Sequence, residues 1–151
     1  MKEFNSINDI LDFAINAEQE AVDFYNQLAE NSKTEDMRFV FISFAQEEME
    51  HKTRLTRIKV EGSYQFEKKE IVDLKIGDYM VSVKPSPEMS YQEALILAMK
   101  KEKAAFRLYY ELAKRANNKE MEDIFVSLAQ EESKHKLRFE IEYDEYVLRD
   151  N

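Results

Sequence analysis

The sequence Phe-Ala-Gln-Glu-Glu-Met-Glu-His at residues 44–51 returns at residues 128–135 as Leu-Ala-Gln-Glu-Glu-Ser-Lys-His. Both copies end in a histidine, and His51 and His135 are the only two histidines of the chain. In each copy a glutamate precedes the histidine by three residues, so on a helix the two side chains share one face. A carboxylate beside an imidazole is a common ligand pair for first-row metals. The repeat therefore predicts a site with two metal ions.

The similarity between the two halves of the chain extends well beyond this motif. Residues 11–55 and 95–139 align without a gap at an offset of 84 residues. Apolar residues recur every three or four positions in both halves, which is the period of an amphipathic helix. Identical pairs at this offset include Leu11 and Leu95, Ala14 and Ala98, Glu18 and Glu102, Tyr25 and Tyr109, and Phe41 and Phe125. One helix–turn–helix unit therefore occurs twice.

Helix-breaking residues are confined to the middle of the chain, because both glycines and both prolines fall between residues 61 and 88. Ser90 and Glu93 have the spacing of a capping box at the start of the third helix. Short turns predict two antiparallel hairpins, and the long crossover lets the second and third helices run parallel. Within the crossover, the apolar stretch 71–76 is expected to pack on the bundle, as a short helix or an extended strip. We predict an all-α four-helix bundle, one domain over residues 1–151, with hairpins over about 7–60 and 89–147 and helices near 7–31, 35–60, 89–116 and 119–147.

Composition narrows the class of function. The net charge of −9 disfavours nucleic acid and anionic membranes as partners, because both are bound through lysine and arginine. The chain has no cysteine, which excludes disulfides, zinc–thiolate sites and iron–sulfur clusters. Its N-terminus lacks the apolar core of a secretory signal, and no apolar run approaches the roughly 20 residues of a membrane helix. We therefore expect a cytoplasmic protein that binds neither nucleic acid nor membranes.

One glutamate interrupts the apolar face of each expected helix. Burying a lone carboxylate costs several kcal/mol, so four of them need compensating charge. Two divalent ions carry four positive charges and balance four carboxylates, while the histidines bind as neutral ligands. Glu47 and Glu131 also repeat, and their exchange with the neighbouring glutamates stays open. The predicted metal ligands are Glu18, Glu48, His51, Glu102, Glu132 and His135.

This arrangement resembles the rubrerythrin family of the ferritin-like superfamily, and its small members in particular. The resemblance is carried by two Glu-x-x-His motifs and by a tyrosine seven residues after the remaining glutamate of each half, Tyr25 and Tyr109. It implies a ferritin-like bundle in which the six predicted ligands hold two iron ions. It also implies that both tyrosines donate hydrogen bonds beside the cluster. Manganese or zinc in place of iron stays open, because ligand type does not settle metal identity.

The resemblance further implies a homodimer that reduces peroxide or dioxygen in defence against oxidative stress. Rubrerythrins carry an additional glutamate three residues from the one at position 102, where this chain has Met99 and Ala105. They also carry a cysteine-built, rubredoxin-like iron site, so here we expect a separate electron donor such as a rubredoxin-like protein. Two alternatives stay open: an iron-binding or sequestering protein with little redox turnover, and a structural bundle whose site is empty or holds a non-redox metal such as zinc.

Overall fold

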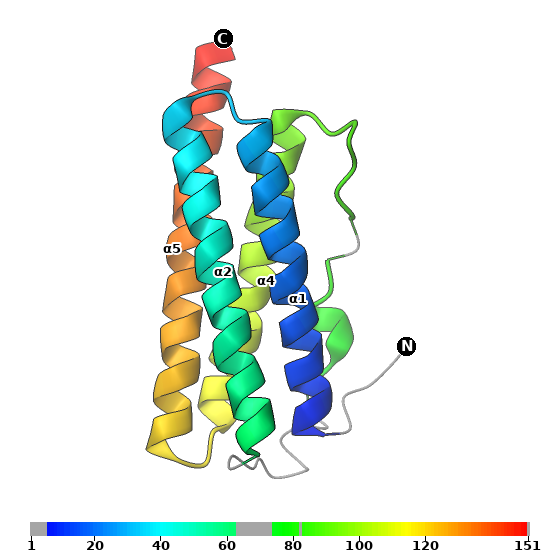
Figure 1. The fold of residues 1–151 in the computed structure, drawn as a ribbon, viewed down its shortest axis with the longest axis vertical. Helices are drawn as coiled ribbons and strands as arrows, with labels where there is room; N and C mark the ends of the chain where they lie inside the picture. The colour runs from blue at the N-terminus through cyan, green and yellow to red at the C-terminus, as the bar shows by residue number, and fades with distance from the viewer. Residues whose placement is uncertain (1–5, 63–73, 82, 151) are drawn as a thin grey trace.

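The computed structural model describes residues 6–62, 74–81 and 83–150, and within them it contains helices and no strand (Figure 1). All four predicted α-helices are present, each with ends within three residues of the predicted ones. Among the described residues, one turn of 3-10 helix is the other element. In chain order the elements are α1 (Ile7–Glu30), α2 (Glu35–Glu61), η1 (Ile76–Asp78), α4 (Tyr91–Arg115) and α5 (Lys119–Asp150).

The residues that cap the helices repeat at the same offset as the rest of the sequence. Ser6 and Ser90 precede the first helix of each hairpin, and Thr34 and Asn118 precede the second. Each side-chain oxygen accepts a hydrogen bond from the backbone N–H three residues further on. Glu93 completes the predicted capping box with Ser90. Local sequence therefore decides where all four helices begin.

The four helices form two antiparallel hairpins, with α1 packed along α2 and α4 along α5. The described residues 74–81 and 83–88 of the crossover lie along the outer side of α1, and α2 and α4 run in the same direction, as predicted (Figure 1). Gly62 ends α2 with φ of 59°, a left-handed conformation that glycine adopts without strain. Leu74 and Tyr79 of the crossover are buried against the bundle. Of the apolar stretch expected to pack there, residues 71–73 lie outside the described residues.

Two apolar clusters fill the two ends of the bundle. One joins the start of α1, the end of α2, the end of α4 and the start of α5, and includes Leu11, Leu55 and Phe125. The other joins the opposite ends of the same helices and includes Phe41 and Phe139. The layer between them, at mid-helix, holds the two histidines and four of the five buried glutamates among the described residues. The fifth, Glu142, accepts a hydrogen bond from Tyr91 of the second cluster. No helix among the described residues is long and apolar enough to cross a membrane.

Candidate metal centre

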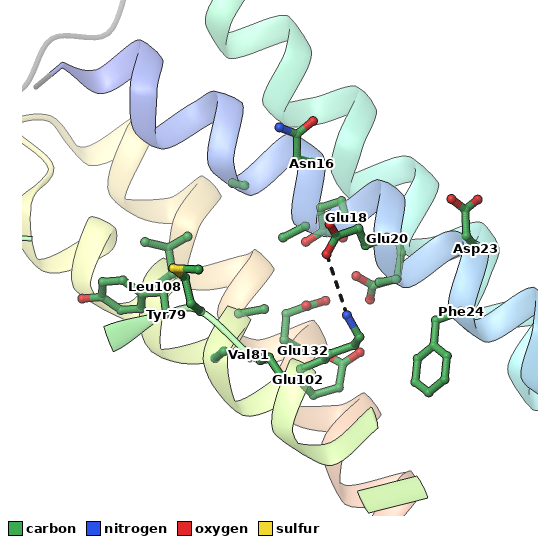
Figure 2. A pocket seen from close by; sticks show the side chains of 18 of the residues that line it. Asn16, Glu18, Glu20, Asp23, Phe24, Tyr79, Val81, Glu102, Leu108 and Glu132 are labelled. Atoms are coloured by element: carbon green, nitrogen blue, oxygen red, sulfur yellow. Dashed lines mark ion pairs between the residues drawn. The ribbon is translucent and has the colours of Figure 1, made fainter. Parts of the chain in front are cut away.

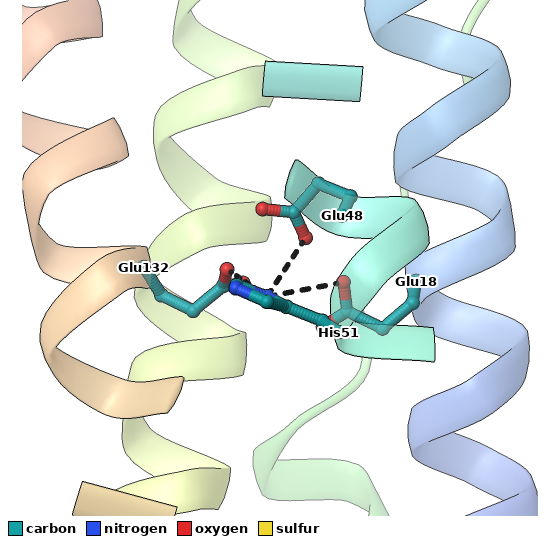
Figure 3. A group of neighbouring side chains, drawn as sticks. All are labelled: Glu18, Glu48, His51 and Glu132. Carbon is teal, nitrogen blue, oxygen red and sulfur yellow. Dashed lines mark ion pairs between the residues drawn. The ribbon is translucent and has the colours of Figure 1, made fainter. Parts of the chain in front are cut away.

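The structure brings all six predicted ligands together in this middle layer. Each is at most 2% exposed, and every helix contributes at least one of them. Around His51, the Nδ1 atom lies 3.0 Å from Glu132 Oε1, 3.6 Å from Glu18 Oε2 and 3.8 Å from Glu48 Oε2 (Figure 3). Around His135, the Nδ1 atom lies 2.7 Å from Glu48 Oε1. Side chains from both hairpins therefore face one another at the spacing that metal ligands need.

The six side chains form two overlapping groups of four. In each group, one ligand-capable atom from every residue lies within 4.8 Å of the others. Glu48 and Glu132 belong to both groups, whereas each remaining residue belongs to one. Two carboxylates would thus be shared if metal ions occupied both groups. The groups are Glu18, Glu48, His51 and Glu132, and Glu48, Glu102, Glu132 and His135.

The hydrogen bonding of the six predicted ligands shows whether these side chains fit a metal. Within the part of the chain that the structure describes, each of the six side chains has a buried oxygen or nitrogen without a hydrogen-bond partner. Two pairs of these atoms are nevertheless in ion-pair contact, His51 Nδ1 with Glu132 Oε1 at 3.0 Å and His135 Nδ1 with Glu48 Oε1 at 2.7 Å. His51 Nε2 also makes no hydrogen bond. Cations bound among the six side chains would satisfy one such atom of each. The atoms are Glu18 Oε2, Glu48 Oε1, His51 Nδ1, Glu102 Oε2, Glu132 Oε1 and His135 Nδ1.

Both histidines turn their outer nitrogen toward a second carboxylate from the opposite hairpin. His135 Nε2 lies 2.9 Å from Glu47 Oε2, and His51 Nε2 lies 3.4 Å from Glu131 Oε2. The Glu47 and Glu131 side chains are 42% and 28% exposed, so they lie at the edge of the layer. A carboxylate on the far nitrogen fixes the ring orientation and tautomer of a metal-binding histidine. The structure therefore places these two glutamates behind the histidines and outside both groups of four.

The sequence carried a signal for these contacts but not their geometry. Glu47 and Glu131 repeat at the 84-residue offset, and each stands four residues before the histidine of its own helix. Spacing along one helix cannot show that each contacts the histidine of the other hairpin. Glu131 is also held by Arg54, whose Nη2 donates to Glu131 Oε2 at 2.7 Å. Glu131 is thus held by both Arg54 and His51.

The two predicted tyrosines exchange partners between the hairpins. Tyr25 of α1 donates its hydroxyl hydrogen bond to Glu102 of α4, and Tyr109 of α4 donates to Glu18 of α1 at 2.5 Å. Burial raises the pKa of both phenols well above its usual value, and the nearby carboxylate charges raise it further. Both hydroxyls therefore stay protonated. Each tyrosine holds one oxygen of a glutamate, and the other oxygen, Glu18 Oε2 or Glu102 Oε2, makes no hydrogen bond.

The histidines are cationic when no metal is bound. Burial lowers the pKa of His51, but the carboxylates of Glu132 and Glu18 outweigh burial and raise it to about 10. Burial also lowers the pKa of His135, and the carboxylates around it, Glu102 first, raise it to about 9. Protons on the imidazoles thus supply part of the positive charge that this layer needs.

Two of the glutamates also bind protons more tightly than usual. Burial raises the pKa of Glu132 to about 8, and the charges of Glu102 and Glu18 add to this effect. Burial raises the pKa of Glu48 well above its usual value in the same way. Burial acts on Glu18 too, but its contacts with Glu48 and His51 outweigh burial and lower its pKa. Divalent cations that bind in this layer would therefore displace protons from the histidines and glutamates and take over the balancing of the carboxylate charge.

A cavity of about 740 Å³ opens onto this layer between α1, α4 and the crossover (Figure 2). Glu18, Glu102 and Glu132 lie at its inner end. Ala105, three residues after Glu102, also lines the cavity. It occupies one of the two positions at which rubrerythrins were expected to carry an additional glutamate that this chain lacks. Small molecules can therefore reach the carboxylates from this side of the bundle.

A bundle with four glutamates and two histidines in its middle layer has the architecture of ferritin-like carboxylate metal proteins. The sequence pattern of the rubrerythrin family matches residues 9–143, and the chain belongs to this family. A solved structure from Thermotoga maritima, described as that of a ferritin-like diiron-carboxylate protein, superposes with a TM-score of 0.77 at 22% sequence identity. That match covers 97% of this chain and 99% of the other, and it shows the shared fold. A comparison with curated proteins finds no match.

Proposed function

We propose that the chain binds two iron ions through its six middle-layer ligands and reduces peroxide, as a defence against oxidative stress. The observation that carries this proposal is that the six buried side chains form two groups of four, in each of which one ligand-capable atom per residue lies within 4.8 Å of the others. Their donor set of carboxylate oxygen and imidazole nitrogen suits iron, although manganese and zinc accept the same donors. Electrons come from a separate one-electron donor protein, since the chain has no cysteine for an iron–thiolate site of its own.

Each part of the layer has a task in holding the ions. Glu48 and Glu132 would serve both ions, whereas Glu18 with His51, and Glu102 with His135, would serve one ion each. Two bound ferrous ions would supply one electron each, which is the pair of electrons that cleaving a peroxide O–O bond requires. The protein supplies the ligands, their orientation and the charge balance.

The surrounding residues keep this geometry while the layer changes charge. The two tyrosines restrain Glu18 and Glu102 without titrating near neutral pH. Phe44 stacks on the ring of His135 with centroids 4.0 Å apart and so restrains its rotation. The apolar clusters at both ends of the bundle exclude water along the axis. Access is thus directed through the cavity between α1 and α4.

Anaerobic reconstitution with ferrous iron, followed by titration with hydrogen peroxide, tests this function. We expect two ferrous ions bound per chain, both oxidised by one equivalent of peroxide, and repeated turnover when a reductant is supplied. The matched control is the Glu48→Ala/Glu132→Ala double variant, which lacks both glutamates common to the two groups. Iron retention equal to that of the control would refute the metal centre.

The same experiment separates the two alternatives. Stoichiometric iron uptake without peroxide turnover would identify a sequestering protein. Metal analysis of protein purified anaerobically reports which metal it carries, and a full complement of zinc with no exchange for iron would identify a structural site. Either result would overturn peroxide reduction as the function.

A further inference from the structure

The cavity beside the metal layer is much larger than hydrogen peroxide or dioxygen requires. Its volume is about 740 Å³, whereas a water molecule in the liquid occupies roughly 30 Å³. Cavities of about 300–1,000 Å³ are typical of sites that enclose a whole organic ligand. The described walls come from α1, from α4 and from residues 79–81 and 83–85 of the crossover. The space is therefore of the size for an organic molecule.

Most of the cavity wall is apolar. Phe24 of α1, Val81 of the crossover and Leu108 of α4 line it (Figure 2). Phe13 of α1 lines it as well. Alanines on the facing helices keep the space between them open, among them Ala17 of α1. Such walls give no advantage to hydrogen peroxide, which is polar, but they stabilise an apolar group that leaves water. At the inner end the lining changes to the glutamates of the metal layer.

The rim of the cavity carries both signs of charge. Lys84 and Lys101 line it together with Glu20 and Asp23. Lys101 Nζ lies 3.9 Å from Glu20 Oε2 and 5.8 Å from the centre of the Phe24 ring, so this ammonium already has partners. Charge at the rim therefore favours neither an anionic nor a cationic ligand, and a neutral molecule suits it.

We propose that this cavity takes an organic hydroperoxide as substrate, with its apolar body against α1, α4 and the crossover and its hydroperoxide group at the metal layer. The inference rests on the proposed function and adds the substrate class. The O–O bond of ROOH breaks, two electrons from the oxidation of two ferrous ions enter, and two protons from solvent are taken up. The products are the alcohol ROH and one water molecule, and the separate donor protein returns both electrons.

Binding can be measured without any turnover. The probe is cumyl alcohol, the product that cumene hydroperoxide would yield, added to metal-free protein and followed by saturation-transfer NMR. The test variant is Ala17→Leu/Ala104→Leu, which fills the cavity from both helices and replaces an exposed and a half-buried alanine. The matched control is Ser43→Leu, at an exposed position of α2 that does not line the cavity. We expect the double variant to bind about tenfold more weakly and the control to bind as the parent does.

Oxidation of the ferrous protein then tests the substrate class. The ratio of the rate with cumene hydroperoxide to the rate with hydrogen peroxide should fall about tenfold in the double variant and stay constant in Ser43→Leu. Absence of probe binding to the parent protein would overturn the proposal, as would equal binding by the double variant. Probe binding without oxidation by cumene hydroperoxide, while hydrogen peroxide still oxidises the protein, would overturn the substrate class alone. Failure of both peroxides to oxidise the protein would refute the proposed function, and the substrate class with it.

Discussion

Filling the metal centre with zinc at pH 7 is expected to release about three to four protons per chain. In the metal-free protein the pKa values of His51, His135 and Glu132 are about 10, 9 and 8, so all three groups carry protons at neutral pH. Burial and the neighbouring carboxylates also raise the pKa of Glu48 well above its usual value, which favours a proton there as well. A group must lose its proton before it ligates a metal, so binding displaces these protons into the buffer.

The size of the effect follows from linkage between metal and protons. Each released proton makes the binding constant about tenfold larger per unit rise in pH, so the overall constant for two ions should rise about 10³- to 10⁴-fold per unit near pH 7. Calorimetric titration with zinc in buffers of different ionisation enthalpy counts the protons directly. The Glu48→Ala/Glu132→Ala variant serves as the control and should show little zinc-linked release. Release of fewer than about two protons by the parent protein would mean that its histidines are neutral, and would refute the electrostatic reasoning.

The remaining predictions concern stability and metal affinity. In the metal-free protein, both histidines have pKa values above the unfolded value of 6.5, so the stability they contribute is complete below pH 6.5 and is lost as pH rises through 9 and 10. The urea midpoint should therefore fall over this range. A flat profile would contradict the raised pKa values of the histidines. Tyr25→Phe and Tyr109→Phe should each lower the free energy of unfolding by about 1–2 kcal/mol, because a buried carboxylate oxygen loses its hydrogen-bond donor. Urea unfolding measures this loss, and unchanged midpoints would show that the hydrogen bonds contribute nothing to stability. Glu47→Gln and Glu131→Gln should weaken zinc binding about 10- to 100-fold, because the outer nitrogens of the histidines lose their carboxylate partners. If calorimetry finds that the variants bind zinc as tightly as the parent protein, the two glutamates do not orient the histidines.

Much of the fold and of the ligand set could be read from local pattern. Apolar periodicity and the 84-residue repeat predicted four helices within three residues of their observed ends. The Glu-x-x-His spacing predicted which side chains share a helix face, because i and i+3 positions are neighbours on any α-helix. The crossover carries no such period, so the turn of η1 and the burial of Tyr79 could not be predicted.

Contacts between helices were decided by the tertiary structure. Glu47 and Glu48 are adjacent in sequence, and only the rotation of α2 against its neighbours places Glu48 inside the layer and Glu47 behind a histidine of the other hairpin. The packing between helices likewise decides that each tyrosine binds a glutamate of the other hairpin, and that a cavity lies between α1 and α4. The sequence by itself determined which residues could meet, since spacing along a helix is local and regular. Which of them do meet depends on the distance and rotation between helices, and these are set by the packing of all four helices at once.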